Sequence, residues 1–204
     1  MFTNKKYRNL ILINLLVLIL IVTSSCSKEN KESTKSDKTA TNEIKDSDLD
    51  EKISKINEEE TYPEVPGSLE EEFSDIEAIK KVSDQIIKCK VKDVKIEKID
   101  NLPQSISKIN IVKSFKGDLK EAEEVSVVEE GGSDGKVLGN IPQLSKDNDY
   151  YLFLKESEGK YFITGAFQGR FIVREDHVFQ QATEDVKLKE YKPLSSKDFE
   201  EILK

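Results

Sequence analysis

The sequence contains very little of several residue types that carry chemistry. Among 204 residues there are one histidine, two cysteines, one methionine and no tryptophan. A single histidine excludes a histidine-rich metal site, and two cysteines argue against a disulfide scaffold. Lysine and arginine total 32 against 40 acidic residues, a formal net charge of −8, which argues against general nucleic-acid binding. With 35% charged residues, the chain does not fit a protein that crosses a membrane many times.

The first residues have the pattern of an export signal. Lys5, Lys6 and Arg8 precede a 13-residue apolar run over 10–22 that only Asn14 interrupts. A basic start, a short apolar run and small residues behind it are typical of a secretory signal peptide. The alternative is an uncleaved membrane helix, which needs about 20 apolar residues. We therefore expect residues 1–25 to be a signal peptide that is removed.

The small residues behind the apolar run end in a cysteine. Ser24-Ser25-Cys26 resembles the lipobox of bacterial lipoproteins. The resemblance implies cleavage between Ser25 and Cys26, acylation of Cys26, and an extracytoplasmic protein anchored to the bacterial cell membrane. Each buried methylene of an acyl chain contributes about 0.8 kcal/mol to such anchoring. Simple secretion with a free Cys26 is the alternative.

The next segment, residues 26–66, has the composition of a tether. Over 27–60 there are seven lysines, eleven acidic residues and five apolar residues, and no aromatic residue, glycine or proline. Such a segment cannot bury enough apolar surface to offset the entropy of ordering it. We expect a disordered, charged linker, transiently helical over 44–60, that ends in the turn-rich stretch 62–67.

Residues 67–204 contain the material for one globular domain. Of 15 aromatic residues, 13 follow residue 61, and eight of these lie between Tyr150 and Phe179. A Ser74-x-x-Glu77 capping box predicts a helix over 75–83, and Ser195 or Ser196 can cap a C-terminal helix. Apolar alternation between them predicts strands at 85–99 with a bulge after Val91, 107–115, 125–128, 150–155, 161–164, 170–174 and 178–180.

These elements define the predicted fold class. About seven short strands lie between two helices, and no helix fits between residues 85 and 180 to connect parallel strands. Evenly spaced strands with short connections favour an antiparallel barrel, whose closure removes exposed edges. We expect a mainly β protein with minor α content: a small antiparallel barrel flanked by a short N-terminal and a C-terminal helix, preceded by the disordered linker.

The order of several short motifs resembles a domain of extracytoplasmic bacterial proteins. The motifs are Ser83-Asp84 with Ile86, Ile87 and Val91, then Phe115-Lys116-Gly117-Asp118, Gly131-Gly132, Tyr150 to Leu154, and Gln168-Gly169-Arg170-Phe171. The resemblance implies an OB-like barrel similar to the metalloproteinase-inhibitor and netrin modules of animals. Those modules depend on disulfides and on an N-terminal cysteine at the inhibitory edge. Residues 67–204 have neither feature. Protease inhibition therefore does not carry over.

The most distinctive loop is rich in glycine. We predict a ligand loop from Gly131, Gly132, Asp134, Gly135 and Asn140, because ordered glycine-rich loops often carry function. No helix start follows the loop, and the residue spacings of known phosphate-binding loops are absent. A Ca²⁺ site from Glu129, Glu130, Asp134 and Asn140 is the alternative, since all four supply hard oxygen donors.

The remaining candidates each have a structural interpretation. Tyr150 and Arg170 are predicted to share a binding face, although pairing of Arg170 with a carboxylate across the barrel is favoured. Cys89 alternates with Ile87 and Val91 and is predicted to be buried, far from its only possible base, His177. We identify no catalytic residue, resident metal or cofactor.

The sequence thus favours a non-catalytic binding module over an enzyme. The expected partners are the membrane, through the lipid, and an envelope protein, peptide or glycan, with no nucleic acid. The alternative is a cell-envelope hydrolase that uses carboxylates or is assisted by Ca²⁺.

Overall fold

The computed structural model describes residues 51–55, 61–62, 71–183 and 185–204. The predicted signal peptide, Cys26 and most of the predicted tether lie outside these residues. Residues 51–55 are helical, within the stretch for which the sequence predicts weak helix. None of the helices in the described ranges is long and apolar enough to cross a membrane.

Most of the described elements are strands. In chain order they are β1 (Thr61–Tyr62), α3 (Ile76–Val82), β2 (Gln85–Ile99), β3 (Leu102–Lys116), β4 (Glu124–Glu130), the 3-10 turn η1 (Leu138–Asn140), β5 (Asp149–Ser157), β6 (Lys160–Ile163), β7 (Arg170–Arg174), β8 (His177–Gln180), β9 (Ala182–Thr183), β10 (Leu194–Ser195) and α4 (Ser196–Leu203). The protein is therefore mainly β, with the short helix α3 directly before the main strands and α4 at the C-terminal end.

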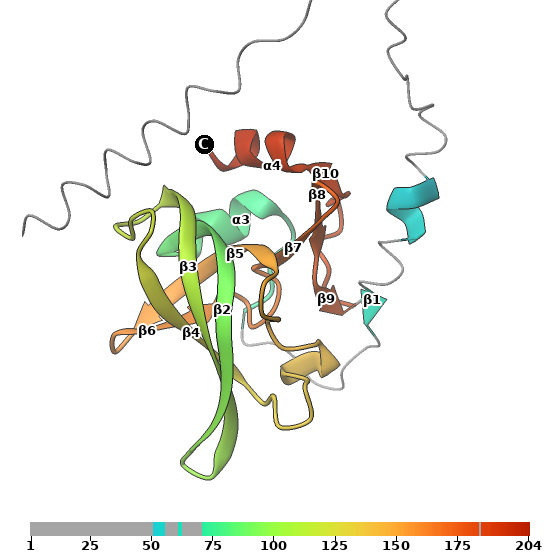
Figure 1. Cartoon of the computed structure of the whole chain (residues 1–204). Coiled ribbons are helices and arrows are strands. Elements are labelled where there is room, and N and C mark those ends of the chain that lie inside the picture. The colour runs from blue at the N-terminus through green and yellow to red at the C-terminus, as the bar shows by residue number, and fades with distance from the viewer. Residues whose placement is uncertain (1–50, 56–60, 63–70, 184) are drawn as a thin grey trace, which may run out of the picture. The chain divides into compact units, whose positions relative to one another are not determined.

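Five strands close into a barrel (Figure 1). They hydrogen-bond in the order β2, β3, β4, β6 and β5, and β5 also pairs with β2. Of these pairings, β4 with β6 is parallel, through Val127 opposite Tyr161 and Val128 opposite Phe162, and the others are antiparallel. This arrangement is a small Greek-key barrel of the OB type, as the sequence predicts.

The sheet continues past the barrel on the far side of β5. Strand β7 pairs with β5, β8 with β7, and β10 with β8, so that eight strands of the described part form one sheet. Strands β1 and β9 form a separate parallel pair. The barrel therefore carries a side extension, which brings the C-terminal segment and α4 next to α3.

Strands β2 and β3 form a hairpin longer than the sequence predicts. The bounds of β2 and the irregularity after Val91 agree with the prediction, because the register shifts between Val91 and Asp93. Strand β3, however, begins at Leu102 instead of 107. The turn between them holds Asp100 and Asn101 at φ of 51° and 67°. Figure 1 shows this hairpin projecting beyond the other strands.

Strand β5 explains the position of the core. Tyr150, Leu152 and Leu154 face the cluster inside the barrel, whereas Tyr151 and Phe153 face a second cluster with residues of α3 and α4. Because both faces of the strand are covered, the sequence there reads as an unbroken apolar run rather than an alternation. The predicted central strand is confirmed.

The helix starts differ in part from the predicted caps. The carboxylate of Asp75, not the hydroxyl of Ser74, caps α3 by accepting from the Ala78 N–H at 2.8 Å. Ser74 instead donates to Asp75, which explains why the predicted capping box is displaced by one residue. At α4, Ser195 is the N-cap and accepts from the Asp198 N–H at 3.1 Å.

Candidate functional site

The predicted ligand loop connects β4 to β5 and is fixed by its own hydrogen bonds. The Gly132 N–H donates to the Lys136 carbonyl at 2.6 Å, and the Gly135 N–H donates to the Gly132 carbonyl at 3.0 Å. Asp134 accepts from the Lys136 N–H at 3.1 Å, which occupies one of its oxygens within the loop. Gly132 has a φ of 97°, and a Cβ there would lie 2.8 Å from Ile96 Cδ1. Glycine is thus required for the loop to pack on β2.

Only part of the predicted loop lines a hollow of the surface. Gly131, Gly132 and Asp134 line a hollow of about 290 Å³ with Leu102 and Lys136, whereas Gly135 and Asn140 lie outside it. Of the four oxygen donors considered for Ca²⁺, Glu129 is buried and Glu130 is exposed. Within the described ranges no three histidine, cysteine or acidic residues lie together as a metal site.

Tyr150 and Arg170 lie together, but inside the protein. Arg170 is 0% exposed and Tyr150 is 1% exposed, so the predicted binding face is wrong for both residues. The guanidinium lies 5.5 Å from the centre of the Tyr150 ring and donates to Glu129 Oε1 at 2.8 Å. It also donates to the Pro142 carbonyl at 2.6 Å. The favoured alternative, pairing of Arg170 with a carboxylate across the barrel, is confirmed.

Gly169, directly before Arg170, is a point of close backbone packing. A Cβ at Gly169 would lie 2.9 Å from the carbonyl oxygens of both Phe153 and Thr164. The backbone at Gly169 approaches β5 and the turn after β6 so closely that no side chain fits. Gly169 therefore belongs to the packing of the barrel and not to a ligand surface.

Cys89 is a core residue. Its side chain is fully buried inside the barrel among apolar neighbours, and this burial raises the pKa of its thiol. His177 lies at the start of β8, where its ring contacts the Glu175 carbonyl. The structure does not bring the two side chains together as a nucleophile and base, and the predicted core role of Cys89 is confirmed.

A hollow of about 400 Å³ lies on the outer face of β3 and β4. Ile106, Val128 and Tyr161 line it, together with Gly159 from the turn between β5 and β6 and Lys160 at the start of β6. An ion pair at 2.7 Å between Lys108 and Glu124 stands at its edge. The corresponding strands and turn of OB barrels form their usual ligand face.

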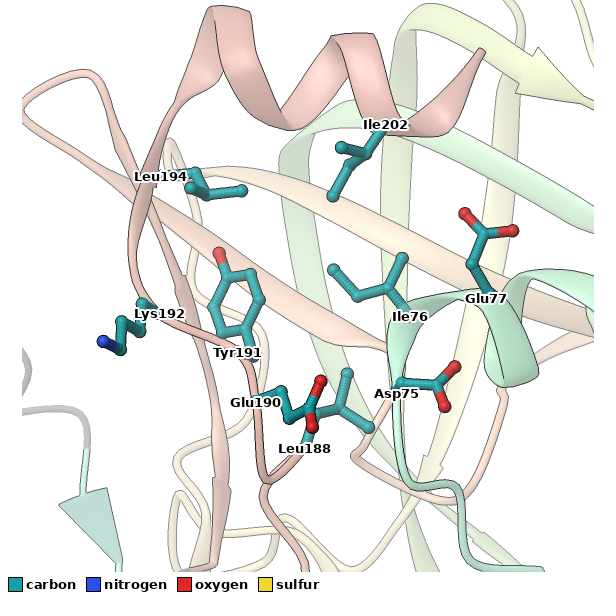
Figure 2. Close-up of a pocket in the computed structure, with 9 residues that line it drawn as sticks. All are labelled: Asp75, Ile76, Glu77, Leu188, Glu190, Tyr191, Lys192, Leu194 and Ile202. Carbon is teal, nitrogen blue, oxygen red and sulfur yellow. The ribbon is translucent and has the colours of Figure 1, made fainter.

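A groove of about 660 Å³ lies beside α3 and α4 (Figure 2). Its lining comes from three segments: the start of α3, the stretch 188–194, and the end of α4. Ile76, Leu188, Tyr191, Leu194 and Ile202 supply the apolar surface of what we call the helix groove. Ile202 is 37% exposed and Leu188 only 3%, so the groove has an accessible wall and a buried floor.

The helix groove is held in a fixed shape. The Tyr191 hydroxyl donates to the Val178 carbonyl at 2.6 Å, and its ring packs edge-on against Phe171 and Phe199 at 5.2 and 6.0 Å. Burial raises the pKa of Tyr191, so that its hydroxyl keeps the proton it donates. Lys80 of α3 donates to the Ile202 carbonyl at 2.8 Å and joins the two helices. A site that is already ordered loses little conformational freedom when it binds.

Charged side chains surround the apolar surface unequally. Asp75, Glu77 and Glu190 place carboxylates at the groove, against the single ammonium of Lys192. In Figure 2 the Lys192 side chain points away from the other labelled residues. Hydrogen bonds from the Ala78 N–H and the Ser74 hydroxyl lower the pKa of Asp75, so this carboxylate is charged at neutral pH.

The sequence did not predict the helix groove. Leu188, Tyr191 and Leu194 recur every third residue in an otherwise charged stretch, and this spacing is the one local signal. The wall formed by the start of α3 comes from residues more than a hundred positions earlier in the chain, and only the fold brings it near this stretch and Ile202. Comparison of the chain with protein-family models and with curated proteins found no match.

Proposed function

We propose that this protein is a binding module, without catalytic activity of its own, held by a lipid on Cys26 at the outer side of a bacterial cell membrane. The observation that carries the binding role is the helix groove, an ordered, apolar concavity of about 660 Å³. Ligand sites have this size and character: a mostly apolar lining with a few polar groups at defined places.

The environment of the titratable groups supports binding over covalent chemistry. Cys89, the obvious nucleophile, is sealed in the barrel with a raised thiol pKa. The buried carboxylate of Glu129 forms an ion pair with Arg170, which balances its charge, and also accepts from the Leu144 N–H at 3.3 Å. Both groups are buried and stabilise the fold. We therefore place the function on the exposed surface of the protein.

The anchor rests on the sequence of the first 26 residues. A basic start, an apolar run over 10–22 and a cysteine directly after Ser24-Ser25 are the features of a lipoprotein signal. One acyl chain binds a membrane only weakly, whereas two chains bind stably. A diacylated Cys26 would keep the domain at the membrane surface while the charged segment behind it sets the distance.

The anchor can be tested in a bacterial host with the full-length chain. Cells are fed a labelled fatty acid and the protein is partitioned between detergent and aqueous phases. We expect label and detergent partition for the wild type and loss of both in Cys26→Ala. Cys89→Val is the control, because it removes the other cysteine within the buried core. Label that persists in Cys26→Ala would contradict the anchor.

The binding role can be tested in the same cells with photo-crosslinking side chains. They are placed one at a time at Ile202 in the helix groove, at Leu102 near the loop hollow and at Phe162 on β6, all of which are exposed. A binding module is expected to give a discrete crosslinked product at one of these positions at least. If none of the three gives a product above the unirradiated sample, the proposed binding function fails.

A further inference from the structure

The rim of the helix groove gives information about the occupant. Three of the four charged side chains that line it are acidic, from Asp75 and Glu77 at the start of α3 and from Glu190 in the segment before β10. Figure 2 shows these carboxylates on two sides of the apolar residues. A ligand seated on the apolar surface therefore has negative charge on more than one side of it.

The three carboxylates differ in the hydrogen bonds and ion pairs that they already form within the protein. Asp75 caps α3 and also accepts from Ser74, so its position is fixed. Glu77 lies 3.5 Å from Lys80, but its own side chain is 75% exposed and only weakly held there. Glu190 forms no ion pair with any residue in the described part of the chain. The rim thus presents one fixed carboxylate and two that are available to a cation.

We infer that the helix groove binds a short segment of a partner protein in which one or two large apolar side chains are flanked by lysine or arginine. This inference rests on the proposed binding function and specifies its ligand. The apolar side chains would lie against Ile76, Leu194 and Ile202. The flanking cations would meet Glu77 and Glu190, where opposite charges favour association and fix the register.

Other occupants fit the same surface less well. An acidic peptide or an anionic lipid surface would bring negative charge against the three carboxylates, which is unfavourable at close range. A neutral glycan could hydrogen-bond the carboxylates through its hydroxyl groups, but it carries no charge to balance them and would place its other hydroxyl groups on apolar side chains. A second copy of this chain carries the same acidic rim, and a two-fold contact would oppose like charges.

The inference can be tested with purified full-length protein in detergent and labelled peptides of equal length. One peptide combines paired leucines with flanking lysines; its companions replace the lysines by glutamates, replace the lysines by serines, or replace the leucines by serines. We expect the basic, apolar peptide to bind at least about tenfold more tightly than each companion. Its affinity should fall as salt is raised, because the charges at the rim are exposed to solvent.

Two substitutions test whether the peptide binds in the helix groove. Ile202→Gln removes an apolar wall, and Glu190→Lys reverses one rim charge; each is expected to weaken the basic, apolar peptide at least about tenfold. The matched controls are Val112→Gln, at an exposed apolar residue of β3, and Glu97→Lys, at an exposed acidic residue of β2. Both controls should bind as the wild type does. Equal loss in the control and groove variants would overturn the inference.

The outcomes separate this inference from the proposed function. Preference for the acidic or the serine-flanked peptide, binding to anionic vesicles, or self-association that Ile202→Gln abolishes would each overturn the peptide assignment while leaving a binding module. Crosslinks in cells at Leu102 or Phe162 but not at Ile202 would likewise overturn the peptide assignment and leave a binding module. Absence of crosslinks at all three positions would instead remove the binding function itself.

Discussion

Glu129 and Arg170 bring opposite charges into the interior of the barrel. Their side chains are 6% and 0% exposed, and the pair joins β4 to β7 while Arg170 also holds Pro142 of the loop. Removing one partner of a buried pair leaves a charge without compensation, which costs about 3–5 kcal/mol. We therefore expect Glu129→Gln to lower the free energy of unfolding by that amount in urea denaturation.

A double substitution provides the control for this pair. Glu129→Leu combined with Arg170→Met removes both charges and retains apolar volume, and such replacements are often neutral or stabilising. The double variant should therefore be more stable than Glu129→Gln. If Glu129→Gln lowers the free energy of unfolding by less than about 1 kcal/mol, the buried pair does not stabilise the fold as we describe.

Glu200 on α4 should make stability depend on pH. Burial opposes ionisation of this carboxyl, but hydrogen bonds from Lys113 at 2.5 Å and Tyr151 at 2.9 Å outweigh it and lower its pKa below the ordinary 4.5. A lowered pKa in the folded state adds stability above the unfolded pKa, and this stability is lost as the pH falls through the folded pKa. The contribution is therefore present at neutral pH and absent in acid.

The variant Glu200→Gln measures this contribution. At pH 7 we expect it to lose about 1 kcal/mol of unfolding free energy, because charged hydrogen bonds are partly screened at this half-buried site. The difference from the wild type should disappear well below pH 4.5, the ordinary value for this carboxyl. Glu201→Gln, whose partner Lys204 is exposed, should change stability little at either pH. A constant deficit for Glu200→Gln across the pH range would contradict the assignment.

At the scale of elements, α4 begins at a side-chain cap. Ser195 satisfies the Asp198 N–H, and the helix then presents Phe199 and Leu203 to the second core cluster. Loss of an N-cap hydroxyl costs about 1 kcal/mol. We expect that loss in Ser195→Ala by thermal denaturation, with Lys197→Ala, at an exposed position of the same helix, as the control. Equal stability of Ser195→Ala and the wild type would argue against the cap.

Local sequence patterns predicted most elements because their cause is local. The alternation in β2 follows burial of one face, and the apolar run in β5 follows burial of both faces. The first part of β3 was missed because Leu102-Pro103 resembles a turn, although Pro103 pairs with Lys98 near the strand start. The cap of α3 was displaced because Ser74 and Asp75 are both good caps, and only the geometry selects Asp75.

The candidate site was harder to predict because its causes are not local. The sequence predicts that Tyr150 and Arg170 share a binding face, but the closed barrel turns both side chains inward, where Glu129 accepts from the Arg170 guanidinium. The helix groove joins residues near 76, 190 and 202, which no periodicity connects. Prediction from sequence therefore succeeded for the scaffold and failed for the surface that the side extension of the sheet creates.

For the molecule as a whole, the closed barrel has one weak seam. Strands β4 and β6 pair in parallel over only two positions, whereas β2 and β3 pair along almost their whole length. Opening a barrel at its shortest pairing breaks the fewest backbone hydrogen bonds, so local opening should begin there. We expect amides of Val127 to Val128 and Tyr161 to Phe162 to exchange with deuterium faster than those of Ile87 to Cys89 in β2.

Hydrogen exchange under native conditions measures this order directly. The amides of Ile86 to Lys90 in β2 and of Tyr150 to Leu152 in β5 should exchange only through global unfolding, because these parts of the two strands pair on both edges and cover both core clusters. Glu129→Gln should speed exchange at the seam more than at β2, since Glu129 follows Val128 on β4 and its partner Arg170 holds that strand to β7. Uniform protection of the five barrel strands would show instead that the barrel opens as one unit, with the β4–β6 pairing as firm as the others.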